Sequence, residues 1–454
     1  MRSTVIGWRA LTFVVVLGLI AAASDSWEDN VPSFNKKPDG AKYSLQVVEK
    51  GIAARYPGDK GIENDTSVVF HETFEEGGIA DLGERWTNIS NKDGRVLAFA
   101  EDAPPGSPGE RCLQMTATKG HDTGGHLWKL LDTGYDQLYA RFYVKFAPDA
   151  PYVHHFVHMG GRFNSPPWPM GGAGSRPDGT ISFSTSMDLV GRDVVDPPGA
   201  WSFYSYWCEM HSWQTPEGES DGRPNGFYGN LFGPVEPLQA KRGEWQCVEI
   251  MIKLNDPEQS NGEQAFWIDG KLVERYGPGT IEGTWFKDMF RRSGVFNTDP
   301  KPFEGFRWRT DDRVKINTFW LQYYLAHVFE NDYNPHDPEI PYNDNIARVH
   351  FDNVVLATEY IGPIVSELPD SGQTGCDFNG DGQATVADVI KLILMQRQDP
   401  ADLQADYNGD GSCTITDAIA LLLDIMAGRC SIPGSVELSA AGRGAQTSNA
   451  VLLK

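Results

Sequence analysis

Hydrophobic and polar positions alternate in short runs along the middle of the chain, from about residue 67 to residue 362. The clearest run is Gln137–Phe146 (QLYARFYVKF), in which every second residue is apolar. A period of two places neighbouring side chains on opposite faces, so this run predicts a strand with one buried face. The Asp269-Gly270 pair predicts a tight hairpin turn. Further strands are expected at 181–187, 201–210, 245–254, 265–268, 318–328 and 349–360.

Many short strands without long helical periodicity favour a two-sheet β-sandwich over residues 67–362. Residues 24–66 are polar and irregular and predict a leader that lies over the core. A short linker is expected at 363–375, and the tail at 431–454 has few structural signals and is expected to be disordered.

Two segments near the C-terminus, 377–388 and 406–417, repeat one pattern of oxygen-bearing side chains. Their spacing is that of a calcium-binding loop, with a glycine at the sixth position for the sharp turn. An apolar stretch of helical spacing follows each loop. The sequence therefore predicts two bound Ca²⁺ ions. The expected metal residues are Asp377, Asn379, Asp381, Gln383, Asp388, Asp406, Asn408, Asp410, Ser412 and Asp417.

The twelfth loop position is Asp in both copies, and no helical segment of EF-hand type precedes either loop. This duplicated loop-then-helix unit, at 376–430, resembles the dockerin module. The resemblance implies a small all-α domain with structural calcium. It also implies attachment to a cohesin domain of a scaffold protein that carries carbohydrate-active enzymes. In such a module the two halves pack with pseudo-twofold symmetry and bring its ends together, which predicts a Cys376–Cys430 disulfide.

The larger domain carries four sequence features in order. They are VVFHETF at 68–74, GEWQCVEIMIKLN at 243–255, NGEQAFWIDGK at 261–271 and HFDNVVLATEYIG at 350–362. Together they resemble concanavalin A-like jelly rolls, among them polysaccharide lyases and glucanases. The resemblance implies a mainly β jelly-roll sandwich with a polysaccharide substrate on one sheet. The reaction it favours is β-elimination on an acidic glycan.

Substrate binding is expected on the polar face of the 137–146 strand, at Tyr139, Arg141, Tyr143 and Lys145. Aromatic rings stack on sugars, and cations bind carboxylates. Trp168, in a loop rich in Gly and Pro, is a further candidate, as are the loop-like Trp285-Phe286 and the aromatic run at 303–309.

Three histidines fall within five residues of the chain. If the segment is a strand, His154 and His158 share a face and His155 points the other way. Histidine can exchange a proton near neutral pH, although such a cluster is also compatible with a structural role. The flanking residues disfavour the helix that a metal pair at this spacing needs. The catalytic candidates are His154, His158, Arg162, Tyr206, His211 and Tyr323.

Two alternatives remain open at this point. A glycoside hydrolase on the same scaffold needs two carboxylates, for which Glu209 and Glu249 are the candidates. A carbohydrate-binding sandwich without catalysis needs neither set of residues.

Composition and the N-terminus narrow the setting. The net charge of −23 disfavours nucleic-acid binding, which needs a basic surface. Residues 1–23 have the pattern of a secretory signal peptide, whose apolar stretch is too short to span a bilayer, so the mature chain is expected outside the cell without a membrane span. Disulfides persist there. Three cysteines remain in the large domain, and Cys208–Cys247 is the expected pair.

Overall fold

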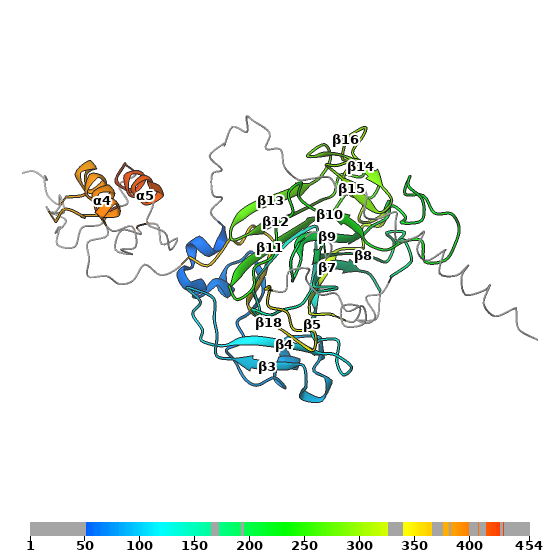
Figure 1. Ribbon diagram of the computed structural model, residues 1–454, viewed down its shortest axis with the longest axis horizontal. Helices are drawn as coiled ribbons and strands as arrows, with labels where there is room; N and C mark the ends of the chain where they lie inside the picture. The colour runs from blue at the N-terminus through cyan, green and yellow to red at the C-terminus, as the bar shows by residue number, and fades with distance from the viewer. Residues whose placement is uncertain are drawn as a thin grey trace, which may run out of the picture. The chain divides into compact units, whose positions relative to one another are not determined.

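The computed structural model describes residues 51–164, 172–191, 195–325, 339–365, 376–380, 383–398, 407, 415–426 and 430. The chain divides into two compact units, a β-sandwich that ends at Pro363 and a unit that contains the C-terminal helices. The sandwich consists of two sheets with few helices (Figure 1). The predictions for residues 1–50 and 431–454 lie outside the described residues. Within the described part, no helix is long and apolar enough to cross a membrane.

One sheet has eight strands, in the order β13-β12-β11-β6-β18-β4-β3, with β1 paired to β18. Their bounds are β1 (Val68–Glu72), β3 (Leu97–Ala100), β4 (Cys112–Thr118), β6 (Gln137–Phe146), β11 (Gln246–Lys253), β12 (Glu263–Ile268), β13 (Lys271–Tyr276) and β18 (Ile346–Ala357).

The other sheet has ten strands, in the order β16-β14-β15-β10-β9-β8-β7-β17-β5-β2. Their bounds are β2 (Asn88–Ser90), β5 (His126–Tyr135), β7 (Val157–Arg162), β8 (Ser182–Val190), β9 (Ala200–Tyr206), β10 (Asn230–Phe232), β14 (Glu282–Phe286), β15 (Met289–Arg291), β16 (Lys301–Pro302) and β17 (Ile316–Gln322). The short helical segments of this unit include α2 (Leu82–Arg85) and 3₁₀ turns at Ile52–Arg55, Ile62–Asn64 and Lys92–Gly94.

The inner faces of the two sheets meet in one aromatic core. Phe142 of β6 and Phe351 of β18 come from the first sheet, and Phe319 of β17 comes from the second. The ring centroids of Phe351 and Phe319 lie 6.3 and 6.5 Å from that of Phe142, and all three side chains are fully buried. The strand predicted at 137–146 is confirmed as β6, because its apolar positions supply this core.

The Asp269-Gly270 turn is also confirmed. It joins β12 to β13, and its two residues have φ angles of 50° and 72°. Positive φ at both central residues is the geometry of a type I′ hairpin, which glycine adopts without steric cost.

Part of the expected leader covers the outer face of the eight-stranded sheet. The backbone N–H groups of Ile52 and Ala53 donate to the carbonyl oxygens of Tyr360 and Ile361, at 3.0 and 2.8 Å. Ile52, Ala53 and Ile361 are almost completely buried. This face therefore has a cover formed by residues from both ends of the sandwich.

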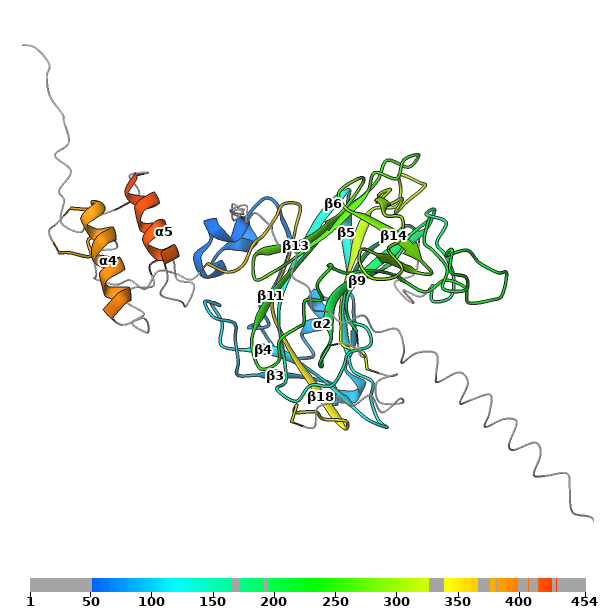
Figure 2. The ribbon, with the colours of Figure 1, turned by 45° about the horizontal axis from the view of Figure 1, so that its top comes forward.

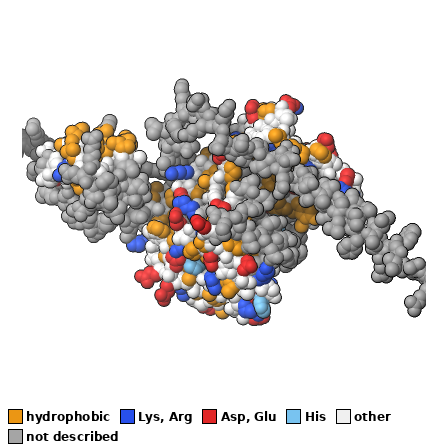
Figure 3. Space-filling view, viewed as in Figure 1, with side chains coloured by type: hydrophobic (Ala, Val, Ile, Leu, Met, Phe, Trp, Pro, Cys, Tyr) orange, Lys and Arg blue, Asp and Glu red, His pale blue; other side chains and the backbone are white. Residues whose placement is uncertain are grey.

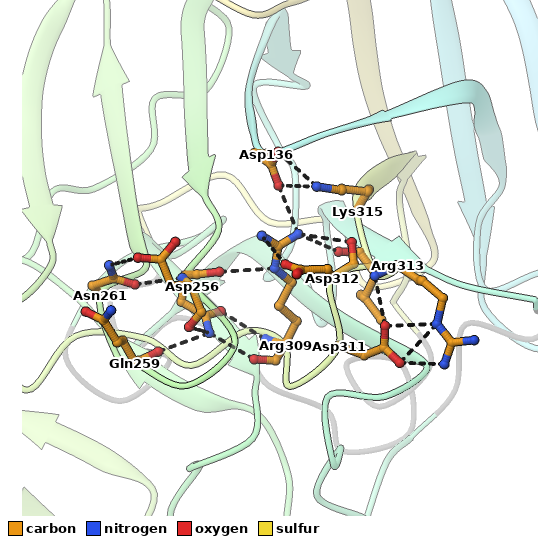
Figure 4. A network of polar contacts seen from close by, with 11 residues as sticks. Asp136, Asp256, Gln259, Asn261, Arg309, Asp311, Asp312, Arg313 and Lys315 are labelled. Atoms are coloured by element: carbon orange, nitrogen blue, oxygen red, sulfur yellow. Dashed lines mark hydrogen bonds and ion pairs between the residues drawn. The ribbon is translucent and has the colours of Figure 1, made fainter.

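A buried arginine ties together three loops at one end of the sandwich (Figure 4). Arg309 is 5% exposed, and its guanidinium donates to the carbonyl oxygens of Asn255 and Val314 and pairs with Asp136 at 2.9 Å. Asn255 in turn accepts from the backbone N–H of Arg309.

The run at 303–309, expected to rim a groove, is instead structural, with Phe303, Phe306 and Trp308 in the core.

The second unit contains two helices, α4 (Val386–Gln398) and α5 (Ile415–Met426), which pack side by side (Figure 2). Val389 and Leu392 of α4 meet Ala418 and Leu421 of α5 in a small apolar core. A disulfide joins Cys376 to Cys430, with their Cα atoms 5.7 Å apart. This is the pairing expected from the sequence.

Candidate functional site

The polar face of β6 is not a substrate-binding surface, contrary to the sequence prediction. Arg141 is fully buried, and its guanidinium donates to the carbonyl oxygens of Gly362 and Asn353. Tyr139 packs against Trp267 and Tyr360, and Lys145 pairs with Asp102 at 3.0 Å. Tyr143 is also buried, at 7% exposure. A central strand whose outer face is covered keeps the same alternation as one whose outer face is open, so periodicity could not separate the two.

The histidines lie in the opposite, ten-stranded sheet. His154 and His155 precede β7, which begins at Val157, so strand alternation does not govern their directions. The rings of His154 and His155 lie 4.1 Å apart, and His155 lies 6.1 Å from His158. The expectation that His155 points away from His158 is therefore wrong. The backbone N–H groups of His154 and His155 both donate to the Tyr324 carbonyl, which holds the segment against the end of β17.

Asp188 on β8 orients His155. Its Oδ2 lies 2.8 Å from His155 Nδ1, and its Oδ1 accepts the backbone N–H of Phe156 at 2.9 Å. Burial alone would raise the pKa of Asp188, but the His155 charge and these hydrogen bonds outweigh burial and lower it. Asp188 is therefore an ionised carboxylate that accepts a hydrogen bond from Nδ1–H of His155, which leaves His155 Nε2 as the basic nitrogen.

His158, on β7, lies on the outer face of the same sheet. Its Nε2 lies 3.1 Å from Gln322 Oε1, and its ring stacks on Trp320 with centroids 4.8 Å apart. Burial lowers the pKa of His158 to about 4. His158 is therefore neutral at neutral pH, and its Nε2–H donates to the side-chain oxygen of Gln322. This contact does not use the side-chain NH₂ group of Gln322.

Two tyrosines of β9 complete the cluster. Tyr204 and Tyr206 share the outer face of the strand, and the Tyr204 ring lies 5.3 Å from that of His155. Burial raises the pKa of both phenols. The two rings meet edge to face, with their centroids 5.7 Å apart. Both phenols therefore keep their protons at neutral pH.

Arg162 lies on the same face of β7 as His158, four residues further along the strand. Burial lowers its pKa. Between Arg162 and the tyrosines, the neighbouring strand carries only Ser182, Ser184 and Ser186 on this face. The imidazoles, the amide and the phenols of this cluster, which we call the His155–Tyr206 cluster, therefore lie around small hydroxyl side chains. The cluster comprises His155, His158, Asp188, Tyr204, Tyr206 and Gln322.

Two other predicted catalytic residues do not join this cluster. Tyr323 is fully buried on the core side of its chain segment and packs against Phe156. His211 stacks on Trp285 at 3.9 Å, and burial lowers its pKa to about 4. Trp285 and Phe286, expected in a loop, belong to β14. Trp168 lies outside the described residues.

The predicted disulfide Cys208–Cys247 is absent, and Cys112, Cys208 and Cys247 are all free thiols. Cys247 lies on β11 of one sheet, whereas Cys208 follows β9 of the other. The candidate strands were recognised correctly, but the sheet to which each belongs is a tertiary property.

The two carboxylates proposed for a hydrolase have separate partners within the protein. Glu249 of β11 is 1% exposed and accepts the backbone N–H groups of Ile361 and Gly362, at 2.7 and 2.8 Å. Glu209 accepts the hydroxyl of Ser260 at 2.8 Å. Glu249 is therefore a structural residue that anchors the end of the sandwich.

Asp188, Gln322 and Trp320 were not predicted. A usable signal was present for Asp188, because Ser182, Ser184, Ser186 and Asp188 make one face of β8 polar up to its last residue, Val190. No comparable signal marks Gln322, whose role depends on the pairing of β17 with β7.

Part of the first calcium loop is described in the helical unit. Asp388 is fully buried, and its carboxylate accepts the backbone N–H groups of Asn379 and Thr385, at 3.1 and 2.7 Å. Asp377 accepts the N–H of Gly380 at 2.7 Å. The loop thus folds back so that its first and twelfth positions approach its middle, which fits a cation-binding loop. Asp381, Asp406, Asn408, Asp410 and Ser412 lie outside the described residues.

No model of a known protein family matches the chain, and no curated protein sequence matches it. Several solved structures resemble the sandwich. An alginate lyase from a Chlorella virus shares 12% identity, covers 63% of this chain and 99% of its own, and has a TM-score of 0.38. The endo-β-1,4-glucuronan lyase of the fungus Trichoderma reesei shares 14%, with coverages of 64% and 96% and a TM-score of 0.36. An alginate lyase from Aplysia kurodai shares 11%, with coverages of 64% and 100% and a TM-score of 0.39.

Proposed function

We propose that the sandwich is a polysaccharide lyase that cleaves an acidic glycan by β-elimination. The observation that carries this proposal is the placement of a histidine base, His155, beside the phenols of Tyr204 and Tyr206. β-Elimination next to a carboxylate needs a proton acceptor, a proton donor and a group that binds the carboxylate. The His155–Tyr206 cluster contains one candidate for each role.

In this proposal His155 Nε2 removes the proton from the carbon that bears the carboxylate. The electron pair of that C–H bond forms a C–C double bond to the neighbouring ring carbon. The bond from that neighbouring carbon to the glycosidic oxygen breaks, and the Tyr206 hydroxyl gives its proton to this oxygen. The products are a new reducing end and an unsaturated uronate, and the proton on His155 returns to Tyr206 through solvent.

The carboxylate of the substrate is held by neutral donors in this scheme. Gln322 offers its side-chain NH₂ group, since its oxygen is engaged by His158. Hydrogen bonds to the carboxylate strengthen as charge moves onto it during proton removal, so they stabilise the transition state more than the ground state. Arg162 lies further along β7 and is suited to a neighbouring uronate.

The direct test is incubation of the purified protein with alginate, glucuronan, pectin, β-glucan and xylan. A lyase produces ultraviolet absorbance from unsaturated ends on one of the three acidic polymers. Reducing ends without that absorbance would indicate a hydrolase and contradict the proposal. Binding without either product would indicate a carbohydrate-binding protein and would contradict it as well.

We infer that the helical unit is a dockerin-like attachment module that holds two Ca²⁺ ions and binds a cohesin domain. When bound, calcium would supply the charge that gathers the loop carboxylates. The described ligand candidates of the first loop are Asp377, Asn379, Gln383 and Asp388. Asp417, also fully buried, lies in the first turn of the corresponding helix of the second half.

The surface of this module supports attachment. Val386, Ile390 and Leu394 of α4 are 48–57% exposed at four-residue intervals. Ile415, Ile419 and Leu423 of α5 repeat the same spacing and are 50–59% exposed. Hydrophobic side chains accordingly gather on the visible face of the module (Figure 3). Matched apolar stripes of this kind are typical of protein-binding surfaces.

Surface plasmon resonance with immobilised cohesins tests the proposal, and an Ile390→Asp, Ile419→Asp variant is expected to lose binding.

We also propose that the protein is secreted, because residues 1–23 have the charge and hydropathy pattern of a signal peptide. N-terminal sequencing of the protein from culture medium is expected to begin at Ser24 or Asp25. Retention of residues 1–23 in the cell-associated protein would contradict this.

A further inference from the structure

The outer face that carries the His155–Tyr206 cluster continues across β10 to β15, toward the edge strands of the sheet (Figure 1). Tyr204 of β9 pairs with Leu231 of β10, and Leu231 pairs with Met289 of β15. Paired residues of adjacent strands share a face. Arg291 lies two positions after Met289 and therefore also points to this face.

Arg291 is a partly buried cation without an anionic partner in the described part of the chain. Its Nη2 lies 3.0 Å from Met289 Sδ. Its Nε is shielded from solvent and has no hydrogen-bond partner among the described residues. Burial lowers the pKa of Arg291, and the nearby charge of Asp288 offsets only part of this effect. Asp288 forms no ion pair with Arg291 among the described residues. The next residue, Arg292, is by contrast paired with Glu274.

The partly buried guanidinium of Arg291 destabilises the folded protein unless a bound anion pairs with it. A guanidinium that loses water without gaining an anion is destabilising. Because the guanidinium presents two parallel N–H groups, the anion that it binds best is a carboxylate or another planar or tetrahedral oxyanion.

An aromatic pair lies on the same hairpin as Arg291. Phe286 pairs with Met289 in the β14–β15 hairpin and so shares the outer face. Phe296 stacks on Phe286, with ring centroids 3.8 Å apart, and is 43% exposed. An exposed ring of this kind can pack against the apolar face of a sugar.

We propose that Arg291 and the Phe286–Phe296 pair form a binding subsite for a second uronate residue of the polysaccharide. β15 lies two strand spacings from β9, or about 10 Å, so this sugar is not the one that reacts. The inference rests on the proposed function for its substrate class. It adds that the enzyme needs a chain extending beyond the cleaved bond, and that longer oligouronates bind more tightly than short ones.

The test measures binding separately from cleavage. Isothermal titration of the full-length Tyr206→Phe variant uses short and long oligosaccharides from alginate and from glucuronan, with cello-oligosaccharides as neutral probes. Adding Arg291→Ala is expected to weaken the binding of long oligouronates about tenfold or more, with a smaller effect on short ones. Arg291→Lys keeps the charge without the fork and is expected to recover part of the loss. Lys301→Ala removes an exposed charge from the edge strand β16 of the same sheet and is the matched control.

Equal affinities of the Arg291→Ala variant and its parent for long oligouronates would overturn the subsite. That result leaves the lyase proposal standing if the unmodified protein produces unsaturated ends. Conversely, a selective loss of oligouronate binding supports the subsite even if no unsaturated ends form, in which case only the lyase proposal fails.

Discussion

His155 and Asp188, 33 residues apart in the chain, are joined by a 2.8 Å contact between Nδ1 and a carboxylate oxygen. The contact joins the segment before β7 to strand β8. It positions the His155 ring, which also lies beside the rings of Tyr204 and His158. It fixes which nitrogen of His155 is basic, and the proposed chemistry depends on that choice.

Replacing Asp188 by Asn is expected to lower kcat by about 10²- to 10⁴-fold, the usual contribution of a general base. The amide can keep its place, but it does not stabilise the Nδ1–H tautomer or the imidazolium that forms. Steady-state kinetics on the best acidic polymer would show the loss in kcat, with KM changed little. A kcat equal to that of the unmodified protein would exclude His155 as an Asp188-oriented base.

Tyr206→Phe is expected to reduce turnover at least about 100-fold while oligouronates still bind, because the leaving oxygen loses its proton donor. Tyr323→Phe is the matched control. The Tyr323 hydroxyl is buried in the core and has no hydrogen-bond partner among the described residues. Its removal should leave kcat unchanged. Equal losses in the two variants would show that packing, and not proton donation, accounts for the effect of Tyr206.

Glu249→Gln separates the structural from the catalytic reading of this carboxylate. Glu249 accepts two backbone N–H groups in a buried position, so the substitution is expected to cost about 1–3 kcal/mol in the free energy of unfolding. Chemical denaturation measures that cost. Activity per folded molecule should remain near that of the unmodified protein, whereas complete loss of activity in a folded variant would revive the hydrolase alternative.

Stability is expected to fall as the pH falls from about 6.5 toward about 4. Burial lowers the pKa of His126, His158 and His211 to about 4, below the ordinary value near 6.5. In this window the unfolded chain binds these protons and the folded protein does not, so protonation favours unfolding. The lowered pKa of Asp188 acts in the same direction at still lower pH.

Thermal melting between pH 4 and pH 8 checks this expectation. His158→Asn should flatten the decline of Tm, whereas the exposed His121→Asn should not change it. A Tm that rises on acidification from pH 6.5 would contradict the assignment of neutral, buried histidines.

Removal of calcium is expected to unfold the helical unit and leave the sandwich folded. Without the ion, the acidic loop side chains repel one another and the loops lose their cross-links. Chelator titration followed by circular dichroism should show a loss of helical signal, and lyase activity should persist. Magnesium is the control cation. Helical signal unaffected by the chelator would contradict the proposed metal sites.

The strands and the loops of the chain could be read from local pattern. The alternation at Gln137–Phe146, the Asp269-Gly270 turn and the repeated acidic loops each depend on neighbours in the sequence. Part of the candidate site followed in the same way, since His158, Arg162 and Tyr206 were recognised from their residue types and strand positions.

The tertiary structure decided which polar face is covered and which carries the cluster. Alternation with a period of two assigns side chains to the two faces of a strand. What each face of the eight-stranded sheet contacts depends on tertiary packing: the ten-stranded sheet covers one face, and the 3₁₀ turns cover part of the other. Arg141 is therefore a structural residue, although the sequence predicted that it binds substrate. His155 lies beside His158, although the sequence predicted that the two side chains point to opposite faces. Asp188 and Gln322 reach the histidines only through pairing between strands distant in sequence, and Cys208 and Cys247 are separated for the same reason. Local residue order determined the elements of this protein, and the long-range packing of its two sheets determined its chemistry.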